Sequence, residues 1–299
     1  MNLRLHILPE LGTRSVATLT RADCRQLIVR CREKGLSAKS TENVCRTLSS
    51  ILSQAVEDEV LPANPALRLG RHYRRGDEPT HEIRPLTREE VAVFLEAARK
   101  HAPREHPLFL CALRTGMRLG ELLGLQWGDV DFHGRFIEVR RNLVGGHVTT
   151  PKSGKARKVD MSAQLTEALR ALLTERKAET LRRGWGAVPD WVFCNEKGGP
   201  LDGDNLRHSV FYPVLKRAEL RRIRFHDLRH TFANLLIQNS ESLAYVRDQL
   251  GHASIQLTVD TYGHLVPGSN RQAVDRLDDA SDTTIRNPAA TGDTKGATA

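Results

Sequence analysis

The chain has 299 residues, a net charge of +9 and 27% charged residues. This length is sufficient for two domains with a sizeable core. The sequence contains no run close to the roughly 20 apolar residues of a membrane span, and its start lacks the apolar core of a signal peptide. We therefore expect a soluble, cytoplasmic protein whose basic charge favours a polyanionic partner such as nucleic acid.

The cysteines are scattered and odd in number. They form no Cys-x-x-Cys pair and show no zinc-like spacing, which argues against a zinc cluster. We interpret them as buried thiols in a reducing compartment. They are Cys24, Cys31, Cys45, Cys111 and Cys194.

Residues 1–75 predict a helical domain. The segment from 16 to 62 is helical in pattern, and five of its apolar residues are spaced to share one helical face. These are Val44, Leu48, Ile51, Leu52 and Ala55. The prolines at 62 and 65 end the helix, because proline removes a backbone donor and disfavours helix in the residue before it.

A basic run leads into a predicted linker at residues 76–85. Arg71, Arg74 and Arg75 lie in this run, and Gly76-Asp77-Glu78-Pro79 interrupts regular structure. Two interpretations stay open: an ordinary solvated patch, or contacts to DNA phosphates that raise affinity without reading sequence.

A second domain is predicted from residue 86 to 268. Thr87 and Glu90 have the spacing of a capping box, and an apolar stripe follows at Val91, Phe94, Leu95 and Ala98. Residues 106–125 predict two helices broken at Thr115-Gly116. This break places Arg118 at the start of the second helix with Glu121 one turn later, either to orient Arg118 or as an ordinary surface pair.

Three strand-like segments follow, at residues 135–139, 147–150 and 156–161. Ser153-Gly154 would supply a turn between the last two. The prediction is an antiparallel sheet that holds Lys152 out on a hairpin. From the residues alone, the preferred interpretation of Lys152 is an ordinary solvated lysine.

The remaining elements are predicted to be helices. Residues 164–183 form an amphipathic helix with Leu165, Leu169 and Leu172 inward, and a helix from 226 onward places His226 and Arg229 on one face. In the next helix Leu243, Val246 and Leu250 form a stripe, and Gly251 suits its C-terminal cap, so His252 lies just past a helix end. In residues 269–299 we expect a short helix from Asn270 to Leu277 and then a disordered tail.

Four short motifs carry chemistry. They are Thr115–Leu122 (TGMRLGEL), His226–His230 (HDLRH), Leu250–His252 (LGH) and Thr261–His264 (TYGH). A tyrosine hydroxyl can form a covalent intermediate, arginine forks match phosphate oxygens, and histidines move protons near neutrality. These are the groups needed to attack a phosphodiester without a metal.

The same segments resemble the tyrosine recombinases, the family of phage integrases and chromosome-dimer-resolving recombinases. Residues 112–131 look like the first arginine box, 226–233 like the second, and 250–262 like the third histidine and the nucleophile. The boxes come in the family's order, and the similarity covers about residues 15–270.

The resemblance implies a mostly α (α+β) fold, with an N-terminal helical core-type DNA-binding domain and a larger helical catalytic domain that carries a small antiparallel β-sheet. It implies a site-specific recombinase that cuts and rejoins DNA through a 3′-phosphotyrosyl intermediate, without metal, ATP or another cofactor. The implied partners are double-stranded recombination sites, further copies of the protein in a tetrameric synapse, and accessory DNA-bending or directionality proteins.

The implied roles fall on six residues. Arg118 and Arg229 would bind the scissile phosphate, and Tyr262 would be the nucleophile. His226 and His252 would hydrogen-bond the phosphate and help to transfer protons. Lys152 would be the general acid, with Lys155 and Lys158 as nearby competitors.

Three other functions are weighed against this one. A DNA-binding protein of the same fold without strand transfer would not need all six positions filled. A type IB topoisomerase-like enzyme would reseal the same strand. A metal-dependent hydrolase would use the zinc-like spacing of His226 and His230, which Arg229 opposes by its charge. Within the family, the sequence leaves open an integrase, a transposon recombinase or a resolving enzyme.

Overall fold

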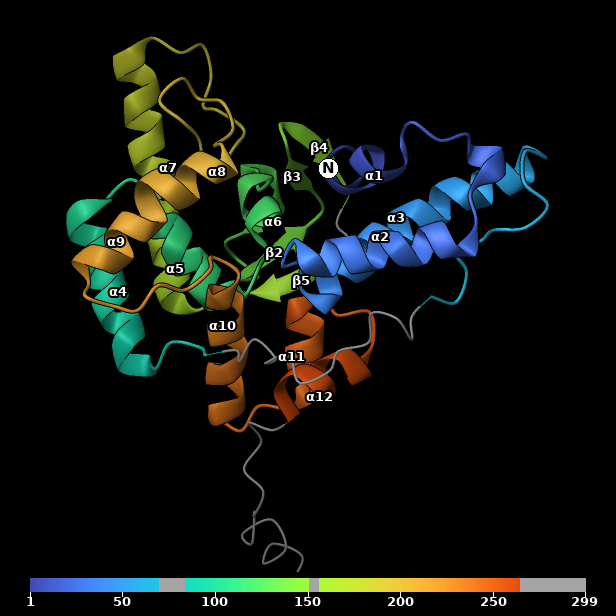
Figure 1. The fold of residues 1–299 in the computed structure, drawn as a ribbon. Helices are drawn as coiled ribbons and strands as arrows, with labels where there is room; N and C mark the ends of the chain where they lie inside the picture. The colour runs from blue at the N-terminus through green and yellow to red at the C-terminus, as the bar shows by residue number, and fades with distance from the viewer. Residues whose placement is uncertain (70–83, 151–155, 264–299) are drawn as a thin grey trace, which may run out of the picture. The chain divides into compact units, whose positions relative to one another are not determined.

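The computed structural model describes residues 1–69, 84–150 and 156–263. The chain divides into two compact units, Met1–Glu82 and Ile83–Ala299 (Figure 1). Several expectations lie outside the described residues: Arg71, Arg74, Arg75, most of the linker, Lys152, Lys155 and the helix from Asn270 to Leu277.

The first unit is helical. Its two long helices begin where side chains cap free backbone amides: Thr20 and Asp23 form a capping box, and Ser37 accepts from the amide of Ser40. Its elements are η1 (Leu3–Ile7), α1 (Leu8–Leu11), η2 (Val16–Thr18), α2 (Arg21–Glu33) and α3 (Ala38–Glu57).

The core of this unit lies between α2, α3 and the N-terminal turns. The predicted face of α3 is buried except for Ile51, which is 37% exposed. That part of the prediction was wrong, because Thr41, Val44, Leu48 and Leu52 form the centre of the buried stripe and Ile51 falls on its edge.

The second unit combines helices with two small sheets, and the predicted mostly α fold with antiparallel strands is confirmed. Its helices are α4 (Arg88–His101), α5 (His106–Thr115), α6 (Leu119–Leu123), α7 (Ala163–Arg183), α8 (Gly203–Asn205), α9 (Tyr212–Arg217), α10 (Asp227–Gln238), α11 (Leu243–Leu250) and α12 (Ile255–Tyr262), with short turns η4 (Trp127–Asp129) and η5 (Leu206–Phe211). Its strands are β1 (Val130–Asp131), β2 (Phe136–Val139), β3 (Asn142–Val144), β4 (His147–Thr149) and β5 (Arg157–Asp160).

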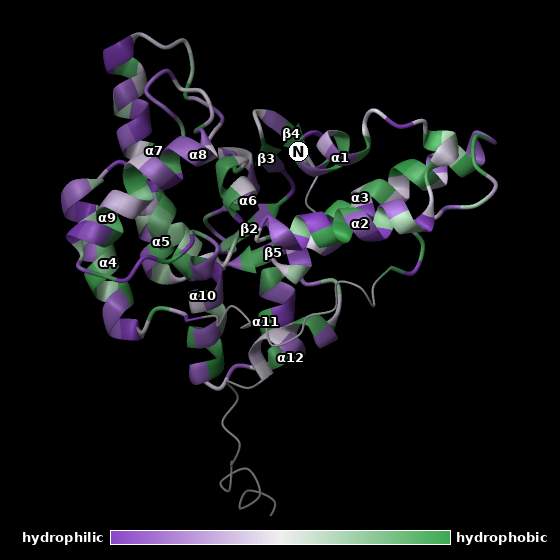
Figure 2. Ribbon diagram, in the orientation of Figure 1, coloured by the Kyte–Doolittle hydropathy of each residue, from purple (hydrophilic) through white to green (hydrophobic). Residues whose placement is uncertain are grey.

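Four phenylalanines mark the centre of the core of this unit. Phe94 meets Phe109 edge to face at a centroid distance of 5.3 Å, and Phe211 meets Phe225 at 5.2 Å. Residues of α5 are almost all buried, and Figure 2 colours much of that helix as hydrophobic. The central helix therefore holds the elements around it in place, including α10, which packs along it.

The strands pair differently from the prediction. β5 pairs with β2, with Val159 opposite Ile137, and β1 completes this antiparallel sheet. β4 pairs instead with β3 in a separate ribbon. The expected pairing of the last two strands was wrong, because Gly145 and Gly146, both with positive φ, close a two-residue hairpin turn directly before β4.

Local signals were correct at several helix ends. Thr87 and Glu90 form the capping box of α4, and the apolar stripe that follows them is buried.

All five cysteines are free and buried. Among the described residues, no helix combines the length and apolarity needed to cross a bilayer.

Candidate active site

Two arginines share one buried carboxylate at the start of α6. The side chain of Glu121 is 1% exposed. Its Oε1 accepts from Arg118 Nη1 at 3.0 Å, and its two oxygens accept from the guanidinium of Arg157 on β5 at 2.9 and 2.8 Å. Glu121 also accepts from the backbone amide of Arg118 at 2.9 Å, as the capping residue of this helix. Glu121 therefore orients Arg118 rather than forming a loose surface pair.

Arg229 is bound by main-chain carbonyls instead of carboxylates. Its residue is 3% exposed, and its guanidinium donates to Gly116 O at 2.8 Å and Leu250 O at 2.7 Å. The first carbonyl ends α5 and the second ends α11, where helix carbonyls lack intrahelical partners. Arg229 on α10 thus connects the two turns that precede Arg118 and His252.

Glycines permit both turns. Gly116 and Gly251 have φ of 61° and 65°, the left-handed conformation that costs other residues energy. A Cβ on Gly116 would collide with the ring of Phe232, and one on Gly251 would stand 2.6 Å from Arg157 Cδ. At these two positions the backbone is so close to the neighbouring side chains that only glycine fits without a shift.

Positive charge dominates this cluster. The guanidinium groups of Arg118 and Arg157 pair with Glu121, and no carboxylate within the described residues pairs with Arg229. Burial, together with the neighbouring charge of Arg118, lowers the pKa of Arg229 to about 9. Binding an anion that the guanidinium groups can match, such as a phosphodiester, is therefore favourable at this site.

Tyr262 lies beside the arginines at the end of α12. It is 1% exposed, and its hydroxyl is 2.7 Å from Nδ1 of His230. Burial raises the pKa of Tyr262 to about 12, although the charge of Arg229 acts in the opposite direction. The phenol is therefore neutral in the free protein.

The two expected histidines flank Tyr262 and Arg229. The ring of His252 stacks on Tyr262 at a centroid distance of 6.3 Å, and its Nδ1 is 2.9 Å from Thr258 Oγ1. Burial and then Arg229 and Arg118 lower the pKa of His252 to about 4. His226 precedes the first turn of α10, and the same three causes lower its pKa. Both imidazoles are thus kept neutral near pH 7.

The structure brings five of the six expected residues together: Arg118, His226, Arg229, His252 and Tyr262. Lys152 lies outside the described residues. Its competitor Lys158 has Nζ 4.2 Å from the centre of the Phe136 ring, on the exposed surface of β5.

Sequence reasoning missed two residues of the cluster, Arg157 and His230. Arg157 donates to Glu121 and to Gln249 O, which are 36 and 92 positions away in the sequence. No local sequence pattern indicates contacts at such separations. His230 was considered only as the partner of His226 in a zinc-like pair. Its ring does contact His226 edge to face at 5.0 Å, but its Nδ1 is engaged by Tyr262.

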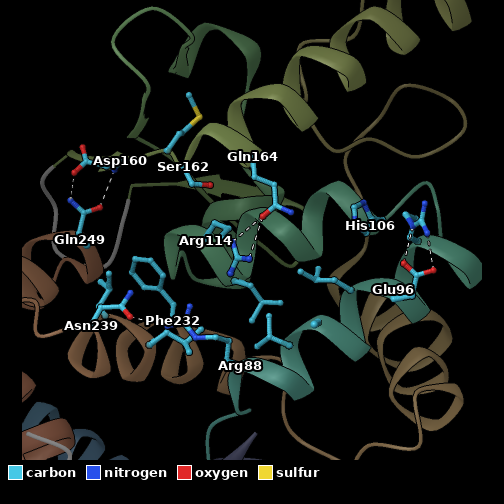
Figure 3. A pocket seen from close by; sticks show the side chains of 18 of the residues that line it. Arg88, Glu96, His106, Arg114, Asp160, Ser162, Gln164, Phe232, Asn239 and Gln249 are labelled. Atoms are coloured by element: carbon cyan, nitrogen blue, oxygen red, sulfur yellow. Dashed lines mark hydrogen bonds and ion pairs between the residues drawn. The ribbon is translucent and has the colours of Figure 1, made fainter. Parts of the chain in front are cut away.

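A pocket of about 840 Å³ lies on another face of α10, between α4, α5, α11 and the start of α7 (Figure 3). Arg114 donates to Gln164 there, and Arg88 donates to Asn239 at 2.8 Å. Neither arginine pairs with a carboxylate in the part of the chain that the structure describes. The apolar lining comes from Val91, Leu95, Leu113, Met161, Phe232, Leu235 and Leu236.

Residues 84–268 match the model of the Phage integrase family. The ICEBs1 integrase of Bacillus subtilis is 32% identical over 260 residues, which cover 83% of this chain and 67% of that protein. Tyrosine recombinase XerC of Oceanobacillus iheyensis is 26% identical over 266 residues, which cover 88% of this chain and 82% of that protein.

Solved structures share the fold. The Tn1549 transposon integrase in complex with transposon right end DNA gives a TM-score of 0.73 at 23% identity, covering 92% of this chain and 91% of that one. A lambda integrase dimer bound to a COC′ core site gives 0.63 at 17% identity, with 86% of each chain covered. The chain belongs to the phage integrase family and is a tyrosine recombinase, an enzyme class that cleaves DNA and transfers strands.

Proposed function

We propose that this protein is a site-specific recombinase that cuts and rejoins DNA through a 3′-phosphotyrosyl intermediate on Tyr262. The observation that carries the proposal is the excess positive charge of Arg118, Arg157 and Arg229 next to the buried phenol of Tyr262. A phosphodiester placed there offsets the charge of the guanidinium groups, and the phenol is the adjacent nucleophile.

The reaction exchanges one phosphodiester for another. Tyr262 Oη bonds to the scissile phosphorus, and the 5′-oxygen leaves with a proton from Lys152, the proposed general acid. Arg118 and Arg229 stabilise the charge that develops on the non-bridging oxygens, where fixed donors lower the barrier most. His226 and His252 add hydrogen bonds to the phosphate and help to move the proton that Tyr262 loses as its bond to phosphorus forms. A 5′-hydroxyl of the partner strand then attacks the phosphotyrosyl bond, which retains the bond energy so that ATP is not consumed.

A nicked suicide substrate tests this proposal. Attack beside a nick releases the short piece of DNA between the cleaved bond and the nick, on the 3′ side of the cleavage site. The covalent protein–DNA adduct therefore accumulates and can be separated on a denaturing gel. We expect wild-type protein to form the adduct in EDTA and Tyr262→Phe to form none while it binds the same DNA. Binding without an adduct on cognate sites would favour a DNA-binding function without strand transfer.

The partners extend the proposal. DNA recombination sites would contact the helical unit Met1–Glu82 and the basic run at Arg71, Arg74 and Arg75, with four protomers forming the synapse. Accessory proteins that bend DNA or set direction would act on this assembly. With chromosomal DNA as the substrate, the protein would work in the cytoplasm at the nucleoid.

Residues 270–280 supply a candidate contact between protomers. This segment carries Val274 and Leu277 among Asp275, Asp278 and Asp279. The pocket beside α10 offers the complementary surface, with an apolar floor and two arginines, Arg88 and Arg114, that pair with no carboxylate among the described residues. Deleting 270–280 should leave binding of a single half-site intact and reduce tetrameric complexes in native gels; an unchanged tetramer yield would contradict this contact.

A further inference from the structure

His230 lies beside the hydroxyl of Tyr262, and none of the roles expected for the six residues falls on it. Its residue is 9% exposed, and Nδ1 lies 2.7 Å from Tyr262 Oη. No other hydrogen-bond partner of this hydroxyl occurs among the described residues. A buried phenol O–H requires an acceptor, so the hydroxyl donates to Nδ1 and the ring proton of His230 sits on Nε2.

His230 is also rigidly placed. It follows Arg229 directly on α10, so the nucleophile's acceptor and a phosphate-binding guanidinium share one helical turn. The ring of His226 stands against it at 5.0 Å, and the ring of Tyr262 at 5.7 Å. Movement of α10 relative to the phosphate would therefore displace both groups together.

The charges around His230 keep it available as an acceptor. Burial and then His226, Arg224 and Arg229 lower its pKa to about 4, and Asp227 opposes them. The ring is thus unprotonated at neutral pH, as a base must be before it acts. A bound phosphodiester adds negative charge beside Arg229. This charge offsets the effect of Arg229 and raises the pKa of His230, so the ring can take up a proton during the reaction.

We propose that His230 is a further catalytic residue, the general base that takes the proton of Tyr262 as the hydroxyl attacks. The inference rests on the proposed role of Tyr262. As the Tyr262 Oη–P bond forms, the Oη–H bond breaks and its proton moves to Nδ1. The bond from phosphorus to the 5′-oxygen breaks, and that oxygen takes its proton from the general acid. In the second half-reaction the imidazolium returns the proton to the phenolate that leaves.

The test compares His230→Asn with wild type in single-turnover cleavage of the nicked substrate at saturating protein. Asparagine Oδ1 can accept the Tyr262 hydrogen bond, but it does not bind a proton at neutral pH. Each protein is also made with 3,5-difluorotyrosine at position 262, which is a more acidic phenol. His208→Asn is the matched control, because His208 lies 5.5 Å from the Tyr212 ring in another His–Tyr pair of the same unit.

A general base of this kind contributes about 10²- to 10⁴-fold. We expect His230→Asn to lose cleavage by about that factor with tyrosine and by less than about tenfold with difluorotyrosine, while DNA binding and the His208→Asn control stay unchanged. Equal losses with both phenols, or wild-type rates in His230→Asn, would overturn the proposal and leave His230 a structural residue.

Two controls separate the possible failures. If wild-type protein forms no adduct, the proposed function fails rather than the role of His230. If His230→Asn does not fold, His230→Ala is assayed with added imidazole. Rescue of cleavage that grows with imidazole supports the base, and absence of rescue in a folded His230→Ala overturns it.

Discussion

Arg229 shows at the scale of one residue how this fold prepares for a phosphate. Its buried guanidinium is held by two carbonyl oxygens, and within the described part of the chain no carboxylate forms an ion pair with it. Its planar fork can bridge Gly116 O and Leu250 O and still present a donor edge. A lysine would have the charge but not this geometry.

We therefore predict that Arg229→Lys lowers the single-turnover cleavage rate by about 10²- to 10³-fold, the usual effect of removing one donor to transition-state charge. DNA affinity should fall much less, because most phosphate contacts lie elsewhere. Arg114→Lys, which alters an arginine bonded to Gln164 in the pocket, is the control. Cleavage at the wild-type rate in Arg229→Lys would show that the fork is not needed.

A buried and a half-buried histidine, both held neutral by the fold, should make the free protein sensitive to acid. His230 and His252 have pKa values of about 4 in the folded state, against 6.5 for an unperturbed histidine. The unfolded state therefore binds protons first, and the stability present above pH 6.5 is lost as the pH falls towards 4.

For each histidine this loss is about 2 kcal/mol between pH 7 and pH 5. Urea unfolding of wild type and His252→Gln at both pH values measures it. The variant should lose about 1 to 2 kcal/mol less than wild type over this interval. Equal losses in the two proteins would mean that the fold does not hold the His252 ring neutral.

At the scale of elements, Arg157 on β5 connects the helix ends that carry Arg118 and His252. Its guanidinium joins Glu121 on α6 to Gln249 O at the end of α11 and packs on Gly251. We infer from these contacts that Arg157 positions Arg118 through Glu121 and His252 through the end of α11.

Replacing Arg157 by methionine should lower cleavage by about 10- to 100-fold in protein that remains folded, because Arg118 loses its fixed partner geometry. Breaking a buried pair costs about 3 to 5 kcal/mol, so rates are measured well below the melting temperature. Arg141→Met is the matched control, since Arg141 pairs with buried Asp129 at 2.5 Å. It should be destabilised while its cleavage rate stays unchanged. Equal cleavage losses in the two variants would assign the effect to stability alone.

The sequence predicted those elements whose signals are local. Gly116, Arg118 and Glu121 lie within six positions, so the turn, the helix start and the orienting carboxylate could all be inferred. The hairpin at Gly145-Gly146 has an equally local signal, two adjacent glycines that can both adopt positive φ. Arg157 and His230 could not be assigned, because their partners Gln249 and Tyr262 come from distant segments that only the packing of α10, α11 and α12 brings together.

At the scale of the whole molecule, the charge of +9 is expected to act through phosphate contacts spread along the chain. If Arg71, Arg74 and Arg75 each contact a phosphate, replacing all three by alanine should flatten the plot of log affinity against log salt by about 3 units. Cleavage at saturating protein should be unaffected. A control that replaces Arg99, Lys100 and Arg183 removes the same charge elsewhere. Equal slopes for wild type and the variant with all three of these arginines replaced would identify the basic run as a solvated patch.

The central claim is that Tyr262 carries the DNA, and mass spectrometry of the adduct tests it most directly. The adduct formed on a nicked substrate is digested with protease and nuclease, and the peptide that retains a nucleotide is sequenced. We predict one modified peptide, with a 3′-phosphate esterified to Tyr262. A nucleotide on any other side chain, or a link through a 5′-phosphate, would contradict the mechanism proposed for this recombinase.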